Sequence, residues 1–243
     1  MIFGPKKMQT KKRAFTLVEL LVVIAIIAIV SAASILSVSI GSGKQALIAG
    51  QQALISVFEE AKLVANGKNA RARVLIYKGD DASRKFRQVG IIYEYFDKYG
   101  NSVGWVSHSS GAMLPKGVFF VPPSGEGDAD LEIQEPYKKT DLPRSTFRNG
   151  TTGAPAAVSM PNFGSVRPQS VGENNGDWYC YEFSPEGLSE NPGATIVVAP
   201  GSVLPSGKYL VENPYMVMGF RIVKSGKTVP FSDATDIEGT TKR

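Results

Sequence analysis

The stretch KKRAFTLVELLVVIAIIAIV, residues 11–30, joins a basic segment to a long apolar run and carries one acid, Glu19, near the start of that run. Residues 20–40 hold no charged side chain over 21 positions, which as a helix would measure ~32 Å and cross a hydrocarbon core of ~30 Å. The basic residues lie only before the run. The positive-inside rule therefore predicts a cytoplasmic segment 1–14, a membrane span and an extracytoplasmic remainder.

The net positive charge of the chain is confined to its first residues. The 243 residues include 27 Lys and Arg against 22 Asp and Glu, a formal charge of +5. Residues 1–14 hold five of these bases and no acid, so the remaining 22 bases match the 22 acids. No run of Lys and Arg with interleaved aromatic residues follows, and we therefore expect no nucleic-acid binding.

Two alternatives apply to the N-terminal segment. A secretory signal peptide has an apolar region of about 7–15 residues before a small-residue cleavage site; Ser31-Ala32-Ala33-Ser34 imitates such a site, but the apolar run here is longer. An acid inside a membrane indicates a function, whereas an acid near the start of a span can extend to the interface instead. Position alone leaves both interpretations of Glu19 open.

The residues around Glu19 carry a longer pattern. Residues 12–20, KRAFTLVEL, together with the apolar run resemble the class III signal of type IV prepilins and pseudopilins. The resemblance implies that a prepilin peptidase cuts between Ala14 and Phe15 on the cytoplasmic side and then methylates the new amino group of Phe15. The family usually has Gly before the cut, and Ala14, the next smallest residue, stands there in this chain.

The resemblance also implies a role for Glu19 and a set of partners. In the family, the acid at this position pairs with the N-terminal amine of a neighbouring subunit, so Phe15 and Glu19 are the predicted assembly residues. The implied partners are the prepilin peptidase, other pilin or pseudopilin subunits, the inner-membrane assembly platform and the membrane. The implied function is a structural subunit of a type II secretion pseudopilus or a type IV pilus, without a cofactor.

An amphipathic pattern continues past the apolar run. Spacings of mainly three, four and seven predict one apolar helix face, with Gln51, Gln52, Glu59, Glu60 and Lys62 elsewhere; this face comprises Leu47, Leu54, Val57, Phe58, Ala61 and Val64. We expect a helix from Phe15 to about Ala65 that stops at Asn66-Gly67, with residues 15–40 in the membrane and 41–66 outside it. Glycines at 41, 43 and 50 leave open a loop at residues 40–44 instead.

From residue 67 the pattern changes to β structure. Short apolar runs between turn residues predict strands at 72–77, 89–96, 103–106, 117–121, 178–183, 194–199, 216–223 and 228–231. We expect a hairpin turn at 224–227, a long loop at about 124–177 and a flexible tail at 232–243. The predicted fold is α+β and pilin-like: a long N-terminal helix packed on an antiparallel β head, residues 67–231.

A shorter motif provides a second resemblance. Phe183-Ser184-Pro185-Glu186-Gly187, followed by a strand at 195–199 and a late hairpin, looks like the C-terminal part of GspH/FimT-type minor pseudopilins. The size of the chain and its long loop favour a minor or specialised subunit in the same way. The alternative is a generic turn in an antiparallel head.

Few residues are suited to catalysis or metal binding. The single His108 lies among serines without a third triad residue, and the single Cys180 lies in an aromatic strand, typical of a core position and unable to form an internal disulfide. Glu126, Asp128 and Asp130 are weak candidates for calcium ligands, against the alternative of a solvated polar loop. We therefore predict no catalytic residue.

Three rival classes stay open. The head could be a module that binds a glycan, DNA or an exported protein through an exposed aromatic or basic patch near residues 124–177. It could be an envelope enzyme with a pocket around His108. The chain could also be a single-pass membrane protein that is never processed.

Overall fold

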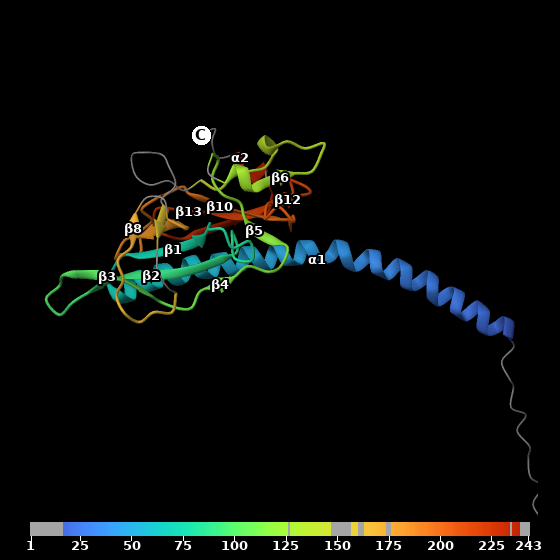
Figure 1. The fold of residues 1–243 in the computed structure, drawn as a ribbon, viewed down its shortest axis with the longest axis horizontal. Coiled ribbons are helices and arrows are strands. Elements are labelled where there is room, and N and C mark those ends of the chain that lie inside the picture. Colours follow the sequence, from blue (N-terminus) through green and yellow to red (C-terminus); the bar gives the residue numbers. More distant parts are fainter. Residues whose placement is uncertain are drawn as a thin grey trace, which may run out of the picture. The chain divides into compact units, whose positions relative to one another are not determined.

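The computed structural model describes residues 17–125, 127–146, 157–159, 163–173, 176–233 and 235–238, and it confirms an α+β fold with a β-rich head (Figure 1). The chain divides into two units, residues 1–42 and 43–243. Helix α1 (Leu17–Lys68) includes residues on both sides of this division. It is continuous through residues 40–44, where the sequence analysis gave a loop as the alternative. Within the described ranges, no helix has the length and hydropathy that a membrane crossing requires.

Helix α1 ends two residues beyond the predicted stop. Asn69 adopts a left-handed φ of 49°, the amide of Ala70 donates to the carbonyl of Ala65 at 3.1 Å, and the amide of Asn69 donates to Asn66 at 3.3 Å. This is the Schellman arrangement, in which one left-handed residue allows the last carbonyls to be satisfied. The prediction of a stop at Asn66-Gly67 is wrong because Asn69, which also tolerates positive φ, is the residue that turns the chain.

Three sheets follow the helix. Sheet A has the order β3-β2-β1-β9-β7-β8, with β4 paired to β2, and comprises β1 (Ala72–Tyr77), β2 (Gln88–Phe96), β3 (Ser102–Ser107), β4 (Ala112–Met113), β7 (Ala157–Ser159), β8 (Gly172–Glu173) and β9 (Trp178–Phe183). Sheet B has the order β14-β13-β10-β5, from β5 (Val118–Phe120), β10 (Thr195–Pro200), β13 (Met218–Ile222) and β14 (Thr228–Phe231). Sheet C joins β6 (Leu131–Ile133), β12 (Tyr209–Val211) and β11 (Ser202–Val203).

All eight predicted strands are present, with bounds that differ from the sequence analysis by at most two residues. The hairpin turn also forms, since the amide of Val223 donates to Lys227 at 3.0 Å. Residues 124–177, expected to be a loop, contain β6, β7, β8, η1 (Asp128–Asp130) and η2 (Lys139–Asp141), and the expected tail contains the short helix α2 (Thr235–Glu238). One described pair, β6 with β12, is parallel, so the head is not purely antiparallel.

Sheet A is buried on both faces. Along β1 and β9, alternate residues point to opposite sides of a strand. Val74 and Tyr181 belong to the main core, which includes the buried side of α1, whereas Leu75 and Cys180 belong to a second core on the other side. We call the α1 side the inner face and the other side the outer face. The outer face needs its own cover because an exposed apolar sheet face is unfavourable.

The predicted apolar face of α1 is the centre of the main core. Its six residues are all 9% exposed or less, and Phe58 is fully buried. The Phe58 ring lies 5.2 Å from that of Tyr181 in sheet A and 5.1 Å from that of Phe220 in sheet B. One helical side chain therefore contacts both large sheets. Gly50 brings the helix close to β5, because a Cβ there would lie 2.7 Å from Val118 Cγ1.

Two polar residues of α1, expected outside the apolar face, also bind the head. Gln51 is 6% exposed, and its Nε2 donates to the carbonyls of Gly219 at 2.6 Å and Phe231 at 2.7 Å. Glu59 accepts from the amide of Thr228 at 3.0 Å and from its hydroxyl at 2.8 Å. The placement of Gln51 on the polar side of the helix is therefore wrong: it satisfies backbone carbonyls of β13 and β14, which helical spacing alone does not show.

Replacing Gln51 by Leu should lower the free energy of unfolding by about 1–3 kcal/mol, because two buried carbonyls lose their donor. Urea unfolding of the full chain in detergent, followed by tryptophan fluorescence, measures this. The matched control is Gln52→Leu at the exposed neighbouring position, which should change stability by no more than about 0.5 kcal/mol. Equal stability of the two variants would contradict the role of Gln51.

Candidate functional site

The processing and assembly residues lie at the N-terminus. Ala14 and Phe15 lie outside the described residues. Glu19 lies in α1, two positions after Leu17, the first described residue of that helix. In sequence it stands four positions after Phe15, which would carry the predicted new amine.

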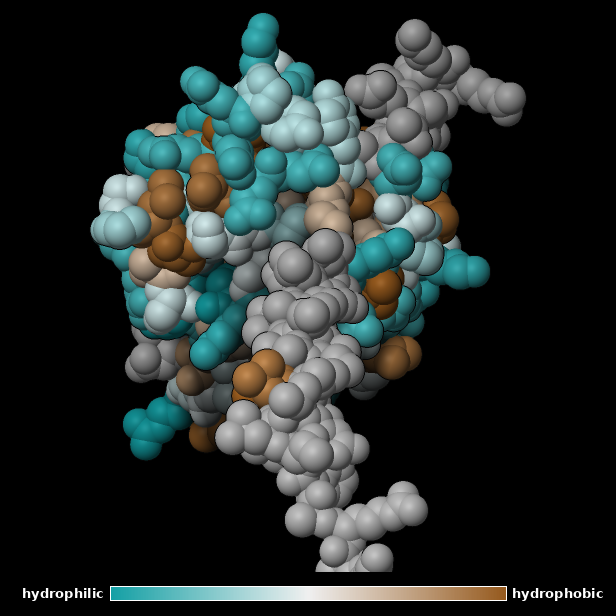
Figure 2. Space-filling view, turned by 90° about the vertical axis from the view of Figure 1, so that its right-hand side faces the viewer, coloured by the Kyte–Doolittle hydropathy of each residue, from teal (hydrophilic) through white to brown (hydrophobic). Residues whose placement is uncertain are grey.

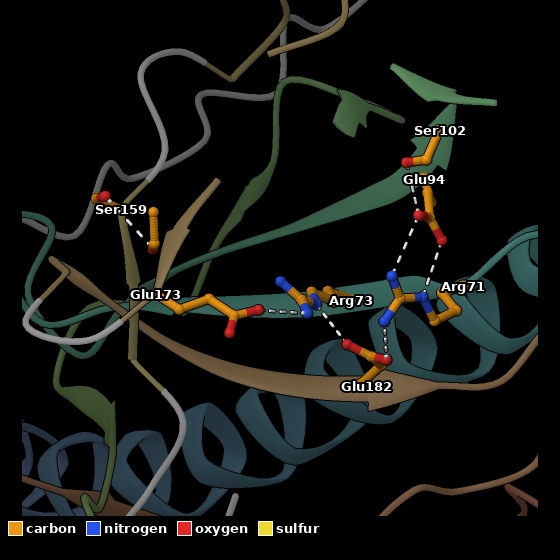
Figure 3. Close-up of polar contacts among 8 residues, drawn as sticks. Arg71, Arg73, Glu94, Ser102, Ser159, Glu173 and Glu182 are labelled. Carbon is orange, nitrogen blue, oxygen red and sulfur yellow. Dashed lines mark hydrogen bonds and ion pairs between the residues drawn. The ribbon is translucent and has the colours of Figure 1, made fainter. Parts of the chain in front are cut away.

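The head carries one large ionic cluster, which we call the polar face: Arg71, Arg73, Glu94, Glu173 and Glu182 on the outer side of sheet A (Figure 3). Arg71 Nε donates to Glu94 at 2.8 Å and Arg71 Nη1 to Glu182 at 3.3 Å. Arg73 Nε donates to Glu182 at 2.5 Å and Arg73 Nη2 to Glu173 at 3.1 Å. Figure 3 shows the two arginines side by side along β1, each reaching glutamates of neighbouring strands.

Strand register creates the polar face. Arg73 lies directly opposite Glu182 in the β1–β9 pair, and opposite charges at such positions stabilise a sheet. The Arg73 guanidinium also lies 4.1 Å from the centre of the Trp105 ring, where a cation is attracted to the aromatic face. Its side chain is 8% exposed. A nearly buried Arg is tolerated here because carboxylates and an aromatic ring replace its water.

The polar face sets two arginines against three glutamates, and each arginine is paired with two of the carboxylates. The hydrogen bond from Arg71 lowers the pKa of Glu94 below its ordinary value of 4.5, and Ser102 adds a second bond at 2.7 Å. Burial raises the pKa of the neighbouring Cys180 thiol to about 12, so Cys180 is protonated at neutral pH and is a poor nucleophile. The Cys180 prediction of a core position is confirmed. The arrangement is suited to fixing strands in register.

Residues 157–159 and 163–173 cover part of the outer face. Val158 is buried, and Phe163 packs with its ring 4.9 Å from that of Trp178. Trp105 exchanges backbone hydrogen bonds with Gln169 at 2.8 and 2.9 Å. Gly90 in β2 makes room, since a Cβ there would lie 2.0 Å from the Phe163 ring. Part of the expected loop is therefore a covering layer of the second core.

Sequence reasoning did not identify the polar face. A signal was present, because the charged residues alternate with apolar ones: Arg71 and Arg73 flank Ala72, and Glu182 lies between Tyr181 and Phe183. That alternation predicts a charged side of each strand. It does not show that residues 109 positions apart face each other, since strand pairing is a tertiary property.

His108 contacts the helix. Its Nε2 lies 3.1 Å from the carboxylate of Glu60 on α1, and its amide donates to Ile91 at 2.9 Å. The neighbouring Ser107 hydroxyl donates instead to the carbonyl of Ser109. A nucleophilic site needs a base within reach of a hydroxyl, whereas the His108 imidazole contacts a carboxylate of α1 and the His108 backbone is bonded to the sheet.

The calcium candidates are engaged in separate interactions. Asp128 pairs with Arg144 at 2.7 Å, and Asp130 pairs with Lys85 at 2.8 Å. Glu126 lies outside the described residues. Within the described ranges, no group of three or more potential metal ligands occurs. The two described carboxylates thus stabilise the fold around η1 through lysine and arginine.

The Phe183–Gly187 motif forms a tight turn next to the end of α1. Phe183 is fully buried, and the amide of Gly187 donates to the carbonyl of Ser184 at 2.8 Å. Gly187 has a φ of 71°, and a Cβ there would lie 2.8 Å from the side chain of Asn66. The turn is present, and its glycine is required both by its conformation and by the helix beside it.

The chain consists of a long N-terminal helix followed by a β head. The comparison with known families identifies the kind of motif at its N-terminus. Residues 9–35 match the family described as the prokaryotic N-terminal methylation motif. This match confirms the resemblance to type IV prepilins and pseudopilins; the GspH/FimT subtype stays a prediction. No curated protein and no solved structure matches the chain.

Stability below pH 4.5 should depend on Glu94. A carboxylate whose pKa is lowered in the folded state stabilises the protein above its ordinary pKa, and this contribution is lost as pH falls through the folded-state value. Glu94→Gln should therefore show a smaller fall in the free energy of unfolding between neutral pH and pH values below 4.5. Urea unfolding at a series of pH values measures it. Glu212→Gln, at an exposed carboxylate, should keep the wild-type slope, and an unchanged slope for Glu94→Gln would refute the prediction.

Proposed function

We propose that the chain is a structural subunit of a type II secretion pseudopilus or a type IV pilus, processed and N-methylated by a prepilin peptidase. The observation that carries this proposal is the methylation motif at residues 9–35, which overlaps the start of α1. In this proposal, residues 1–14 are a leader on the cytoplasmic side, residues 15–40 anchor the chain in the inner membrane, and the head lies outside. The assembly platform then moves the mature subunit into the filament.

The junction between Ala14 and Phe15 has the chemistry that such processing needs. Ala14 is small, so its side chain fits a site adapted to Gly with one extra methyl group. Phe15 becomes the first residue, and its amine carries a positive charge that methylation retains. The apolar residues that follow keep this amine close to apolar surroundings, where an unpaired charge is costly.

Glu19 is the partner we propose for that amine. Cleavage creates a cation, and an ion pair lowers the cost of placing both charges away from water. The amine of one subunit pairs with Glu19 of its neighbour, which sets the axial position of each subunit. The position of Glu19 supports this role, since it is an acid only four residues after Phe15 and the residues that follow it are apolar.

The rival classes have less support. The ligand-binding alternative needs an exposed patch, and Figure 2 shows one side of the head on which hydrophobic residues form small areas between hydrophilic ones. The enzyme alternative depended on His108, which pairs with Glu60 on α1. The structural-subunit proposal uses the one motif that the comparison with known families matches.

N-terminal processing is the first test. In a strain with prepilin peptidase, intact-mass analysis of the membrane form should show loss of residues 1–14 and one methyl group on Phe15. Ala14→Gly should be processed as well or better, whereas Ala14→Leu should accumulate uncut, because the larger side chain does not fit a site for small residues. A peptidase-negative strain is the control. An uncut wild-type N-terminus in the peptidase-positive strain would contradict the proposal.

Assembly is the second test. Glu19→Ala should be cleaved normally but enter filaments roughly tenfold less than wild type or worse, because an unpaired amine in apolar surroundings costs a few kcal/mol. Immunoblots of sheared filaments, compared with the membrane fraction, measure incorporation. Thr16→Ala is the matched control and should assemble normally. Wild-type incorporation of Glu19→Ala would refute the pairing role.

A further inference from the structure

A cavity of about 240 Å³ lies where sheets B and C meet. Residues 116–119 at the start of β5 form one wall, residues 201–203 around β11 form the other, and Arg87 and Tyr209 complete the lining. The amide of Gly201 donates to the carbonyl of Gly117 at 2.9 Å. Pro200 and Val118 are also paired in register. The two walls are therefore held together by the backbone, and the cavity is preformed.

Glycine is required at one wall. A Cβ on Gly201 would lie 2.6 Å from the carbonyl oxygen of Leu210 and 2.6 Å from the Phe119 ring. Both neighbours are packed, since Phe119 is fully buried and Leu210 belongs to β12. Gly201 allows the backbone to lie directly on the aromatic ring, which keeps the cavity open beside it.

The cavity carries positive charge that its own lining does not balance. Two lining residues are cations, Arg87 and Lys116, and none is acidic. Arg87 is held by neutral groups: its Nη2 donates to the carbonyl of Leu114 at 2.8 Å and its Nη1 to that of Ser83 at 3.4 Å. Its buried Nε has no hydrogen-bond partner among the described residues. Carbonyl groups fix the guanidinium in place while leaving its charge available to an anion.

Asp81 and Asp130, the carboxylates near Tyr209, are engaged by other groups. Asp81 accepts from the amide of Ser83 at 3.0 Å and from its hydroxyl at 2.6 Å. Asp130 pairs with Lys85 at 2.8 Å. These contacts lie close to the Tyr209 hydroxyl, which donates to the carbonyls of Ala82 and Lys85. The cations of the cavity thus face a space that no described carboxylate fills.

The rest of the lining indicates the shape of the ligand. Val203 supplies exposed apolar surface above the buried Val118, Phe119 and Tyr209, and Ser202 supplies a hydroxyl. Pockets for drug-sized ligands measure roughly 300–1,000 Å³, so this cavity suits one ring. A sugar ring offers an apolar face for the side chains and hydroxyls for polar groups, and an acidic substituent matches the two cations.

We propose that this cavity binds a single sugar unit that bears an anionic group, a carboxylate or a phosphate. Arg87 and Lys116 bind the anion, Ser202 binds a ring hydroxyl, and Val203 contacts the apolar face of the ring. The site lies in the head and is independent of the N-terminal processing signal, so it does not rest on the structural-subunit proposal.

The test uses the full chain in detergent and four probes: glucuronate, glucose 6-phosphate, glucose and inorganic phosphate. Calorimetry or NMR titration should detect binding of glucuronate, of glucose 6-phosphate or of both, and no binding of glucose. The sugar anion that binds shows whether the site recognises a carboxylate or a phosphate. If inorganic phosphate binds as tightly as the sugar anions, the sugar ring contributes nothing to binding and the proposal of a sugar ligand is overturned. If no anion binds, the proposed site itself is overturned.

Variants locate the binding in this cavity. Lys116→Glu should weaken binding about tenfold or more, the loss expected for one charge-assisted hydrogen bond. Lys116 is exposed, so its replacement leaves the fold intact. Lys227→Glu, the same charge change at an exposed turn between β13 and β14, is the control and should bind as wild type does. Equal weakening by both variants would show a general charge effect and overturn the proposal.

Arg87→Lys is the second variant. It keeps the positive charge but removes the planar guanidinium, and it should weaken binding while thermal unfolding confirms that the head is folded. Val203→Trp fills the cavity from an exposed strand position and should abolish binding without removing a charge. Retained binding in Val203→Trp would place the ligand elsewhere and overturn the proposal.

Discussion

The packing of one helix face against two sheets is the constraint on which the head depends. Phe58 lies at the centre of this contact, between Tyr181 of sheet A and Phe220 of sheet B. Burying a Phe side chain contributes about 1.5–3 kcal/mol, and its removal would leave a cavity that neither sheet can fill alone. Because both sheets use the same side of α1, their relative position is set by that helix. The close approach at Gly50 adds β5 to the same surface.

Polar interactions then fix the axial position of the helix and the register of the strands, which apolar packing alone does not determine. Apolar contacts are non-directional, so they permit a helix to slide or rotate slightly on a sheet. Gln51 and Glu59 bind specific backbone groups of β13 and β14, and this defines one axial position of α1. On the opposite side of sheet A, Arg73 and Glu182 do the same for the pairing of β1 with β9. These contacts position the helix and the strands, whereas Arg87 and Lys116 line the cavity at the junction of sheets B and C.

The two ends of the chain serve different purposes in this organisation. The N-terminal segment carries the methylation motif, and its proposed chemistry needs only a small residue, a new amine and one acid. The head carries the three sheets and the side-chain clusters described above. Its second core, covered by residues 157–159 and 163–173, buries apolar side chains on the outer face of sheet A.

Local sequence determined the elements that repeat along the chain: the apolar face of α1, the eight strands and the hairpin at 224–227, because helical and strand periodicities are read within a few residues. It also determined the methylation motif at residues 9–35, since that motif is a pattern of contiguous residues. Only the tertiary structure decided that Gln51 is buried, that Arg73 meets Glu182 and that the expected loop contains strands. The Gln51 and Arg73 contacts join residues 168 and 109 positions apart, and such pairing follows from how the whole chain packs rather than from any local pattern.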